Sequence, residues 1–153
     1  MMKKSFISKA LTVTMVMMMV VSAVRLEPVS ADSKDRPFWL EFTSDIPGVV
    51  TPMEKKANSS SVYMKSMYMN TTYVAHVVGG DADIPTDAVD CSMGRYYLFN
   101  YLDCARFMYN DVHERGCTAA AVSATGSPGA VSGYWSPDSV PQAGVLPPTD
   151  YIK

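Results

Sequence analysis

The sequence lacks the short motifs that mark the common hydrolases and nucleotide-binding enzymes. It contains no G-x-S-x-G nucleophile elbow, no H-E-x-x-H zinc helix and no glycine-rich phosphate loop. Histidine, a frequent general base at neutral pH, occurs only twice, at His76 and His113. These absences predict a protein that is not an enzyme and that uses no cofactor and no metal ion.

Positive charge is scarce as well. The chain has 13 Lys and Arg against 15 Asp and Glu, a net charge of −2, and no extended run of basic residues. Nucleic acids are bound through clustered Lys and Arg that neutralise phosphates, and basic patches also attract anionic surfaces. The sequence therefore predicts neither a nucleic-acid partner nor electrostatic adhesion to an anionic surface.

Long hydrophobic runs are absent except at the N-terminus. Basic residues precede the apolar stretch Ala10–Val21, and sites of small residues follow it. This order is typical of a secretory signal peptide. The alternative, an uncleaved transmembrane anchor, needs about 20 apolar residues, and this run is slightly shorter. We expect cleavage after Ala31, because cleavage after Ala23 would leave an apolar stub on the product.

The predicted product is a secreted chain of residues 32–153, which does not insert into a membrane. Removal of residues 1–31 leaves 9 basic and 14 acidic residues, a net charge of −5. A chain of this length suits one domain that buries about two-thirds of the surface its unfolded form exposes. We assign residues 32–139 to that domain. The proline-rich tail 140–153 is expected to be extended and loosely attached.

Cysteine occurs three times, at Cys91, Cys104 and Cys117. In a secreted chain this number predicts one disulfide with one cysteine left over, or one disulfide and an intermolecular bond, and the pairing stays open. Together with His113 the cysteines could also hold zinc. That alternative is disfavoured because no C-x₂-C pair is present.

Several segments alternate apolar and polar residues with the period of a β-strand. In 37–43, Phe38, Leu40 and Phe42 share one face and Trp39 lies opposite. The same alternation occurs in 71–78, through Tyr73, Ala75 and Val77, and in 117–125, through Ala120, Val122 and Ala124. A Gly-Ser-Pro-Gly turn then leads into a return strand at 130–135.

Other segments are less regular. Residues 62–70 and 71–78 suit either an antiparallel pair or one long bent strand, 46–51 a turn and 53–61 a loop. Residues 81–90 contain four aspartates but do not match a calcium-loop pattern, so we interpret them as a solvated turn. Residues 95–112 combine strand alternation with helical spacing, which favours a strand followed by a short helix or turn. The resulting fold is a single antiparallel β-sandwich or open barrel of five to seven strands, with one short helical insert.

The predicted fold depends most on the segment from 110 to 139. We interpret 110–116 as a hydrogen-bonded loop in which Glu114 holds backbone amides, in preference to a catalytic role. A tryptophan and a Ser-Pro-Asp turn close the domain. The predicted structural motif comprises Asn110, Val112, Glu114, Gly116, Gly133, Trp135, Ser136, Pro137 and Asp138.

These residues also carry a family resemblance. The patterns Tyr97-x-Phe99, Asn110-x-Val112-x-Glu114-x-Gly116, Ala120-x-Val122-x-Ala124 and Ser132-Gly133-x-Trp135-Ser136-Pro137-Asp138-Ser139 resemble an uncharacterised family of small secreted proteins from Gram-positive bacteria. That family is itself distantly similar to the lactococcin 972 type of β-sandwich bacteriocin. The resemblance implies secretion and an all-β domain, and it brings no catalytic residues. The three cysteines depart from the family pattern.

The sequence leaves three functions open. The first is a secreted, non-enzymatic module that binds a bacterial cell surface or envelope, and the second is a bacteriocin-like toxin. The third is a small hydrolase, which would require His113, Glu114 and Cys117 to converge in a cleft. Trp39 and Trp135 could line a platform for a glycan or a peptide, although such aromatics more often belong to the core and girdle of a sandwich.

Overall fold

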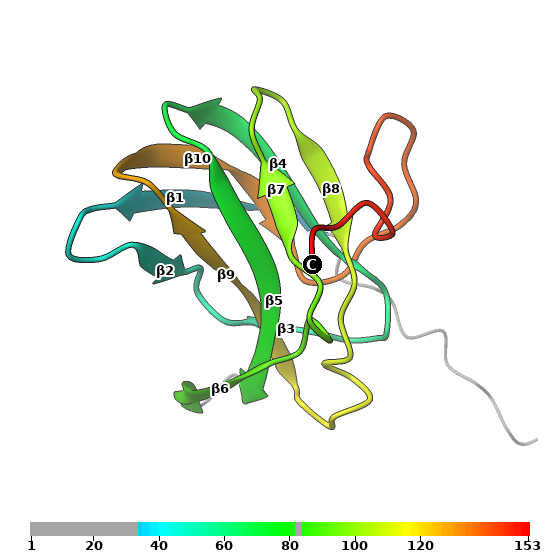
Figure 1. Cartoon of the computed structure of the whole chain (residues 1–153). Coiled ribbons are helices and arrows are strands. Elements are labelled where there is room, and N and C mark those ends of the chain that lie inside the picture. Colours follow the sequence, from blue (N-terminus) through cyan, green and yellow to red (C-terminus); the bar gives the residue numbers. More distant parts are fainter. Residues whose placement is uncertain (1–33, 82–83) are drawn as a thin grey trace, which may run out of the picture.

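A computed structural model describes residues 34–81 and 84–153, without the side chains of 84–86. The predicted signal peptide and its cleavage site lie outside these residues. The described part of the chain contains ten strands and no helix, and so no helix that could span a membrane. The strands, labelled in Figure 1, are β1 (Arg36–Phe42), β2 (Gly48–Val50), β3 (Glu54–Lys55), β4 (Val62–Met69), β5 (Tyr73–Asp81), β6 (Ile84–Asp90), β7 (Tyr97–Phe99), β8 (Ala105–Met108), β9 (Ala119–Gly126) and β10 (Gly129–Ser136).

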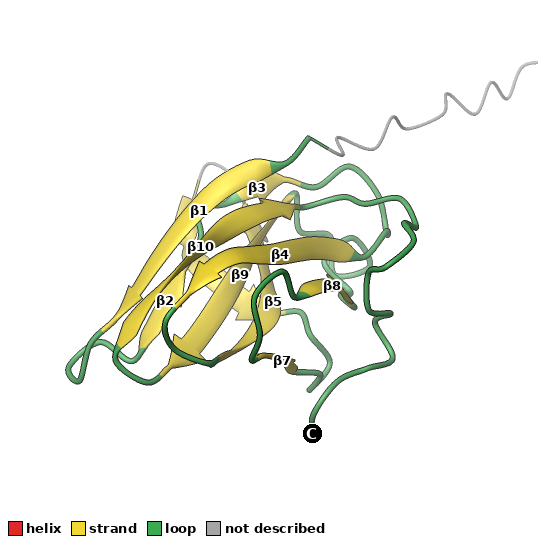
Figure 2. Cartoon of the chain, turned by 90° about the horizontal axis from the view of Figure 1, so that it is seen from above, coloured by secondary structure: helices red, strands yellow, loops and turns green. Residues whose placement is uncertain are grey.

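The strands form two antiparallel sheets that face each other (Figure 2). Sheet A has the order β1-β10-β4-β8, and sheet B has the order β2-β9-β5-β6, with β3 paired to β9 and β7 paired to β5. The predicted all-β sandwich or open barrel is therefore confirmed. Pro37 lies in β1, an edge strand, where its missing N–H costs no hydrogen bond between inner strands.

The core lies between the two sheets and follows the predicted alternation. Phe38, Leu40 and Phe42 of sheet A are buried, as are the residues of β5 and β9 that were expected to share a face. Trp135 is only 1 % exposed, so replacing it with alanine would cost about 3–5 kcal/mol. Ser66 points into this core from sheet A, and its hydroxyl hydrogen-bonds to the Tyr73 hydroxyl of sheet B at 2.5 Å.

Strand β4 contains a β-bulge opposite β10. Gly133 pairs with Ser66 and Ser132 pairs with Tyr68, so Met67 is an extra residue on β4. The bulge requires a glycine, because a Cβ atom at position 133 would overlap the carbonyl oxygen of Lys65. A lone glycine inside a strand is a known sign of a bulge or of close backbone approach.

The connectivity differs from the hairpins that the sequence suggested. Strands β4 and β5 are neither an antiparallel pair nor one bent strand, because β4 belongs to sheet A and β5 to sheet B. The turn at 127–128 likewise leads from β9 in sheet B to β10 in sheet A. Alternation shows that each strand has one buried face, and it does not show which sheet the strand joins.

The predicted helical insert is also wrong. Residues 105–108 form β8, which pairs with β4. The residues with helical spacing belong to two strands, β7 and β8, and to the turn between them, where Asp103 has a positive φ of 59°. Three strands were missed as well: the short strands β2 and β3 lie in segments predicted as turn and loop, and β6 occupies most of the predicted solvated turn at 81–90. The strand count therefore exceeds five to seven.

The tail 140–153 is attached more firmly than expected. Main-chain hydrogen bonds join Leu146 to Ala105 and Phe107 on β8, and others join Ile152 to Tyr96. Arg106 Nη1 binds the Asp150 carboxylate at 2.6 Å. The prolines prevent regular pairing along the tail, yet these separate anchor points hold it against β7 and β8.

The bulge at Gly133 provides a test of the fold. We expect Gly133→Ala to lower the free energy of unfolding by more than about 3 kcal/mol, above the 1–3 kcal/mol of ordinary overpacking, because the clash is with backbone. Gly48→Ala on β2 is the control, since a Cβ there meets Thr125 Oγ1 at an ordinary 3.6 Å. Urea denaturation of both variants measures the difference. Equal stability of the two would contradict the bulge.

Candidate functional site

Several of the predicted motif residues converge on a buried lysine that the sequence did not single out. Lys56 Nζ donates hydrogen bonds to the carbonyl oxygens of Ser60 and Pro137, both at 2.7 Å, and to Asp138 Oδ1 at 3.1 Å. Asn110 Nδ2 donates to the same Ser60 carbonyl at 3.0 Å. Three acceptors around Nζ match the three N–H donors of an ammonium group.

The carboxylate of Asp138 is equally well held. Its Oδ2 accepts from the Ala57 amide at 2.8 Å, and its Oδ1 accepts from the Ser60 hydroxyl at 3.2 Å. Neither the Lys56 nor the Asp138 side chain is exposed to solvent. Burial lowers the pKa of Lys56, and the attraction to Asp138 opposes that shift. This buried pair ties the 56–61 loop to the end of β10, which is a structural arrangement with no access for a substrate.

The loop 110–116 is hydrogen-bonded, but not by Glu114. The amides of Arg115, Gly116 and Cys117 donate to main-chain carbonyls of the loop itself. Val112 is buried in the core, Gly116 has a positive φ of 74°, and Glu114 is exposed. His113 is exposed beside it. Within 34–81 and 84–153, no group of three His, Cys, Asp or Glu side chains is arranged to hold a metal ion.

The three cysteines are not bonded to one another. Cys91 and Cys117 lie close together beside Gly79. Cys104 is buried near Tyr101 and Ser66.

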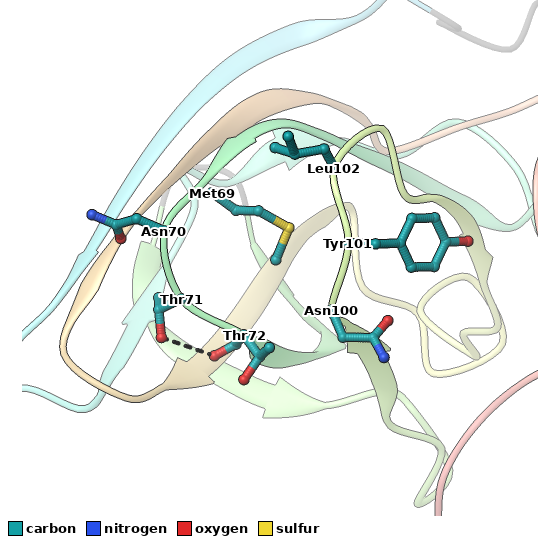
Figure 3. Close-up of a pocket in the computed structure, with 7 residues that line it drawn as sticks. All are labelled: Met69, Asn70, Thr71, Thr72, Asn100, Tyr101 and Leu102. Atoms are coloured by element: carbon teal, nitrogen blue, oxygen red, sulfur yellow. Dashed lines mark hydrogen bonds between the residues drawn. The ribbon is translucent and has the colours of Figure 1, made fainter.

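An open pocket of about 450 Å³ lies at one end of the sandwich (Figure 3). In the figure the Met69 side chain lies between the turn that carries Asn70 and the turn that carries Leu102. None of the lining residues is an acid, a lysine, an arginine, a histidine or a cysteine, which leaves the pocket without a strong acid or base. They are Met69, Asn70, Thr71, Thr72, Asn100, Tyr101 and Leu102.

A third feature is a group of exposed aromatic side chains on the outer face of sheet A. Trp39, Tyr68 and Tyr134 are 62 %, 46 % and 46 % exposed, and we call these three residues the aromatic platform. Trp39 and Tyr68 share one row of the sheet, each opposite Ser132 of β10. Their rings are parallel, with an interplanar angle of 8° and centroids 6.1 Å apart. Tyr134 lies in the row between Pro37 and Lys65.

Strand alternation and the bulge place these rings outside. Trp39 faces solvent because its neighbours Phe38 and Leu40 face the core, and Tyr134 faces solvent because Trp135 is buried. Tyr68 differs, since strict alternation from the buried Ser66 would turn it inward. The extra residue Met67 restores Tyr68 to the outer face. The sequence predicted the outward Trp39 but missed Tyr68, because only Gly133 signals the bulge.

Trp135, the other tryptophan considered for a platform, belongs to the core. It is 1 % exposed and pairs on its two sides with Arg36 and Met64. Lys65, which pairs with Tyr134, forms an ion pair with Asp103 at 3.2 Å, and the exposed Met67 adjoins Tyr68. An exposed apolar patch is typical of an interaction surface.

A family of proteins of unknown function, DUF2712, matches residues 22–139 of the chain. The chain belongs to this family. The match covers the aromatic platform, the Lys56–Asp138 pair and all three cysteines, and it ends where the tail begins. No curated protein and no solved structure matches the chain.

The buried ion pair can be tested by removing one partner. We expect Lys56→Met to lower the free energy of unfolding by about 3–5 kcal/mol, because Asp138 would remain buried without its counterion. Lys55→Met is the matched control, since the Lys55 side chain is exposed on β3. Urea denaturation compares the two variants. A loss below 1 kcal/mol for Lys56→Met would show that the pair does not hold the loop to β10.

Proposed function

We propose that the protein is a secreted, non-enzymatic module that binds uncharged polysaccharide of a cell envelope through the aromatic platform. The observation that carries this proposal is the parallel, solvent-exposed pair Trp39 and Tyr68 on the outer face of sheet A. Large aromatic side chains are costly to leave in water. Their exposure in a small domain therefore favours a role in binding.

The chemistry of the platform suits a sugar. The negative face of an aromatic ring attracts weakly positive C–H groups, which cover one face of a pyranose ring. The hydroxyls of Tyr68 and Tyr134 and that of Ser132 between the rings would supply hydrogen bonds to the sugar hydroxyls. The site also needs little reorganisation, because the three residues lie on strands rather than on loops.

Charge and size favour a neutral glycan over the other candidate partners. The chain carries a net charge of −2, and −5 without residues 1–31, which opposes binding to an anionic polymer. A stable protein partner would cover about 800 Å² on each side, far more than three aromatic rings with Ser132 among them. A chain of neutral sugars needs only a narrow strip of this face.

The positions of the residues weighed for hydrolysis support the non-enzymatic proposal. The residues weighed for hydrolysis, His113 and Glu114, are both exposed on one turn, while Cys117 is in contact with the Gly79 region. The described pocket has no acid or base strong enough for general catalysis at neutral pH. A platform that binds without cutting fits these features better.

Replacing one platform ring tests the proposal. We expect Trp39→Ala to weaken binding to an insoluble uncharged glycan, such as purified chitin, by about 30-fold, the loss of a contact of about 2 kcal/mol. Tyr68→Ala should act in the same direction. Tyr101→Ala is the matched control, because Tyr101 is 49 % exposed but lies off sheet A. Co-sedimentation of each purified variant with the glycan gives the dissociation constant.

Three other outcomes would favour a different binding site or a different function. Equal binding by Trp39→Ala and Tyr101→Ala would place the contact elsewhere. Release of reducing sugars from the glycan would indicate a hydrolase. Growth arrest of Gram-positive cells at low density, with the protein added to the medium, would favour the bacteriocin-like toxin that the sequence resemblance implies.

A further inference from the structure

Two of the three cysteines, Cys91 and Cys117, lie next to each other beside Gly79 of β5. Gly79 pairs with Val89 of β6 on one side and with Ala120 of β9 on the other. Cys91 directly follows β6, and Cys117 lies two residues before the start of β9. The two cysteines therefore reach Gly79 from opposite sides of β5. Residues 91 and 117 are far apart in the sequence, and only the sheet brings them together.

The space above Gly79 is occupied by these two side chains. A Cβ atom at position 79 would lie 2.8 Å from Cys91 Sγ and 3.3 Å from Cys117 Cβ. Any side chain here would displace the Cys91 sulfur. The absence of a side chain at Gly79 is therefore what allows the two cysteines to approach each other.

The thiols are close enough to influence each other. Burial raises the pKa of Cys91 to about 12, and the charge of Cys117 and a hydrogen bond with it act in the same direction. Cys91 is fully buried, whereas Cys117 is partly exposed. Cys104 is also fully buried, and its neighbours are Tyr101 and Ser66 rather than another thiol.

We propose that Cys91 and Cys117 form a disulfide bond across Gly79 in an oxidising environment, and that Cys104 remains a buried free thiol. This pairing is one of three that the sequence leaves open. It fits the secretion expected from the N-terminal segment, because secreted proteins keep disulfides. It is independent of glycan binding, since it involves sheet B and not the aromatic platform.

The reaction needs an external oxidant of the disulfide class, such as oxidised glutathione or an oxidoreductase disulfide. The more accessible Cys117 thiolate attacks one sulfur of that oxidant and releases a first thiolate. Cys91 then loses its proton to solvent and attacks Cys117 Sγ, which expels the second thiolate. Cys91 and Cys117 together lose two electrons and two protons and gain one S–S bond, and the oxidant becomes two thiols.

The bond would fasten the edge of sheet B. Strand β6 is an edge strand, paired with β5 alone in the strand order. A bond from Cys91 to Cys117 links the end of β6 to the start of β9 across β5. It also closes the segment that contains β7 and β8 into a covalent loop, which restricts the unfolded chain.

Peptide mapping can identify the pairing directly. Trypsin cleavage after Lys65, Arg95, Arg106 and Arg115 places each cysteine on its own peptide: 66–95, 96–106 and 116–153. The full chain is equilibrated with reduced and oxidised glutathione, alkylated under denaturing conditions, digested and analysed by mass spectrometry. We expect peptide 66–95 linked to 116–153, an intact mass lower by two hydrogens before alkylation, and an alkylated 96–106. Links to peptide 96–106, or three alkylated cysteines in strongly oxidising buffer, would overturn the proposal.

Variants separate the pairing from general oxidation. In Cys104→Ser the intact mass should still fall by two hydrogens on oxidation. In Cys91→Ser this loss of two hydrogens should not occur. Gly79→Ala, which places a methyl group against Cys91 Sγ, should lower the equilibrium constant for oxidation by glutathione by about tenfold or more. Gly48→Ala is the control and should leave that constant unchanged. Unaltered oxidation of Gly79→Ala would contradict the geometry on which the pairing rests.

Discussion

The structure depends on the register of β10 between β1 and β4. Because strand side chains alternate, this one register sends Val131 and Trp135 into the core and Ser132 and Tyr134 to the surface. A slip by one residue would bury the tyrosine and expose the tryptophan. Gly133 fixes the register, since only a glycine lets the Lys65 carbonyl approach at the bulge. The same strand pairing therefore determines both the packing of the core and the position of the aromatic platform.

Two further contacts hold the chain where the sheets alone do not. The buried pair of Lys56 and Asp138 joins the loop after β3 to the end of β10, and the contact of Cys91 with Cys117 joins the two sides of β5. Both occur at strand ends, where main-chain pairing stops. A small sandwich has a limited core, so such local ties have a large effect on whether its loops keep one conformation. Neither contact involves the aromatic platform on the outer face of sheet A.

Sequence alone predicted the faces of strands better than their partners. The alternation of Phe38, Leu40 and Phe42 identified the buried face of β1 and the outward Trp39, because the pattern is local. The sheet to which each strand belongs is a long-range property that no local pattern encodes. Lys56 escaped notice because a lysine in a polar loop is normally solvated. Tyr68 escaped notice because the bulge changes the side on which β4 side chains fall.

In the proposed function, the protein contacts its partner at Trp39. Its two tryptophans make a direct measurement feasible, since Trp39 is 62 % exposed and Trp135 is 1 % exposed. Acrylamide quenches the fluorescence of exposed tryptophan and leaves buried tryptophan largely unaffected. With a saturating soluble oligosaccharide of a glycan that co-sediments with the protein, we expect most of the quenchable fluorescence to be lost. If the oligosaccharide binds while Trp39 stays fully quenchable, the contact does not involve Trp39.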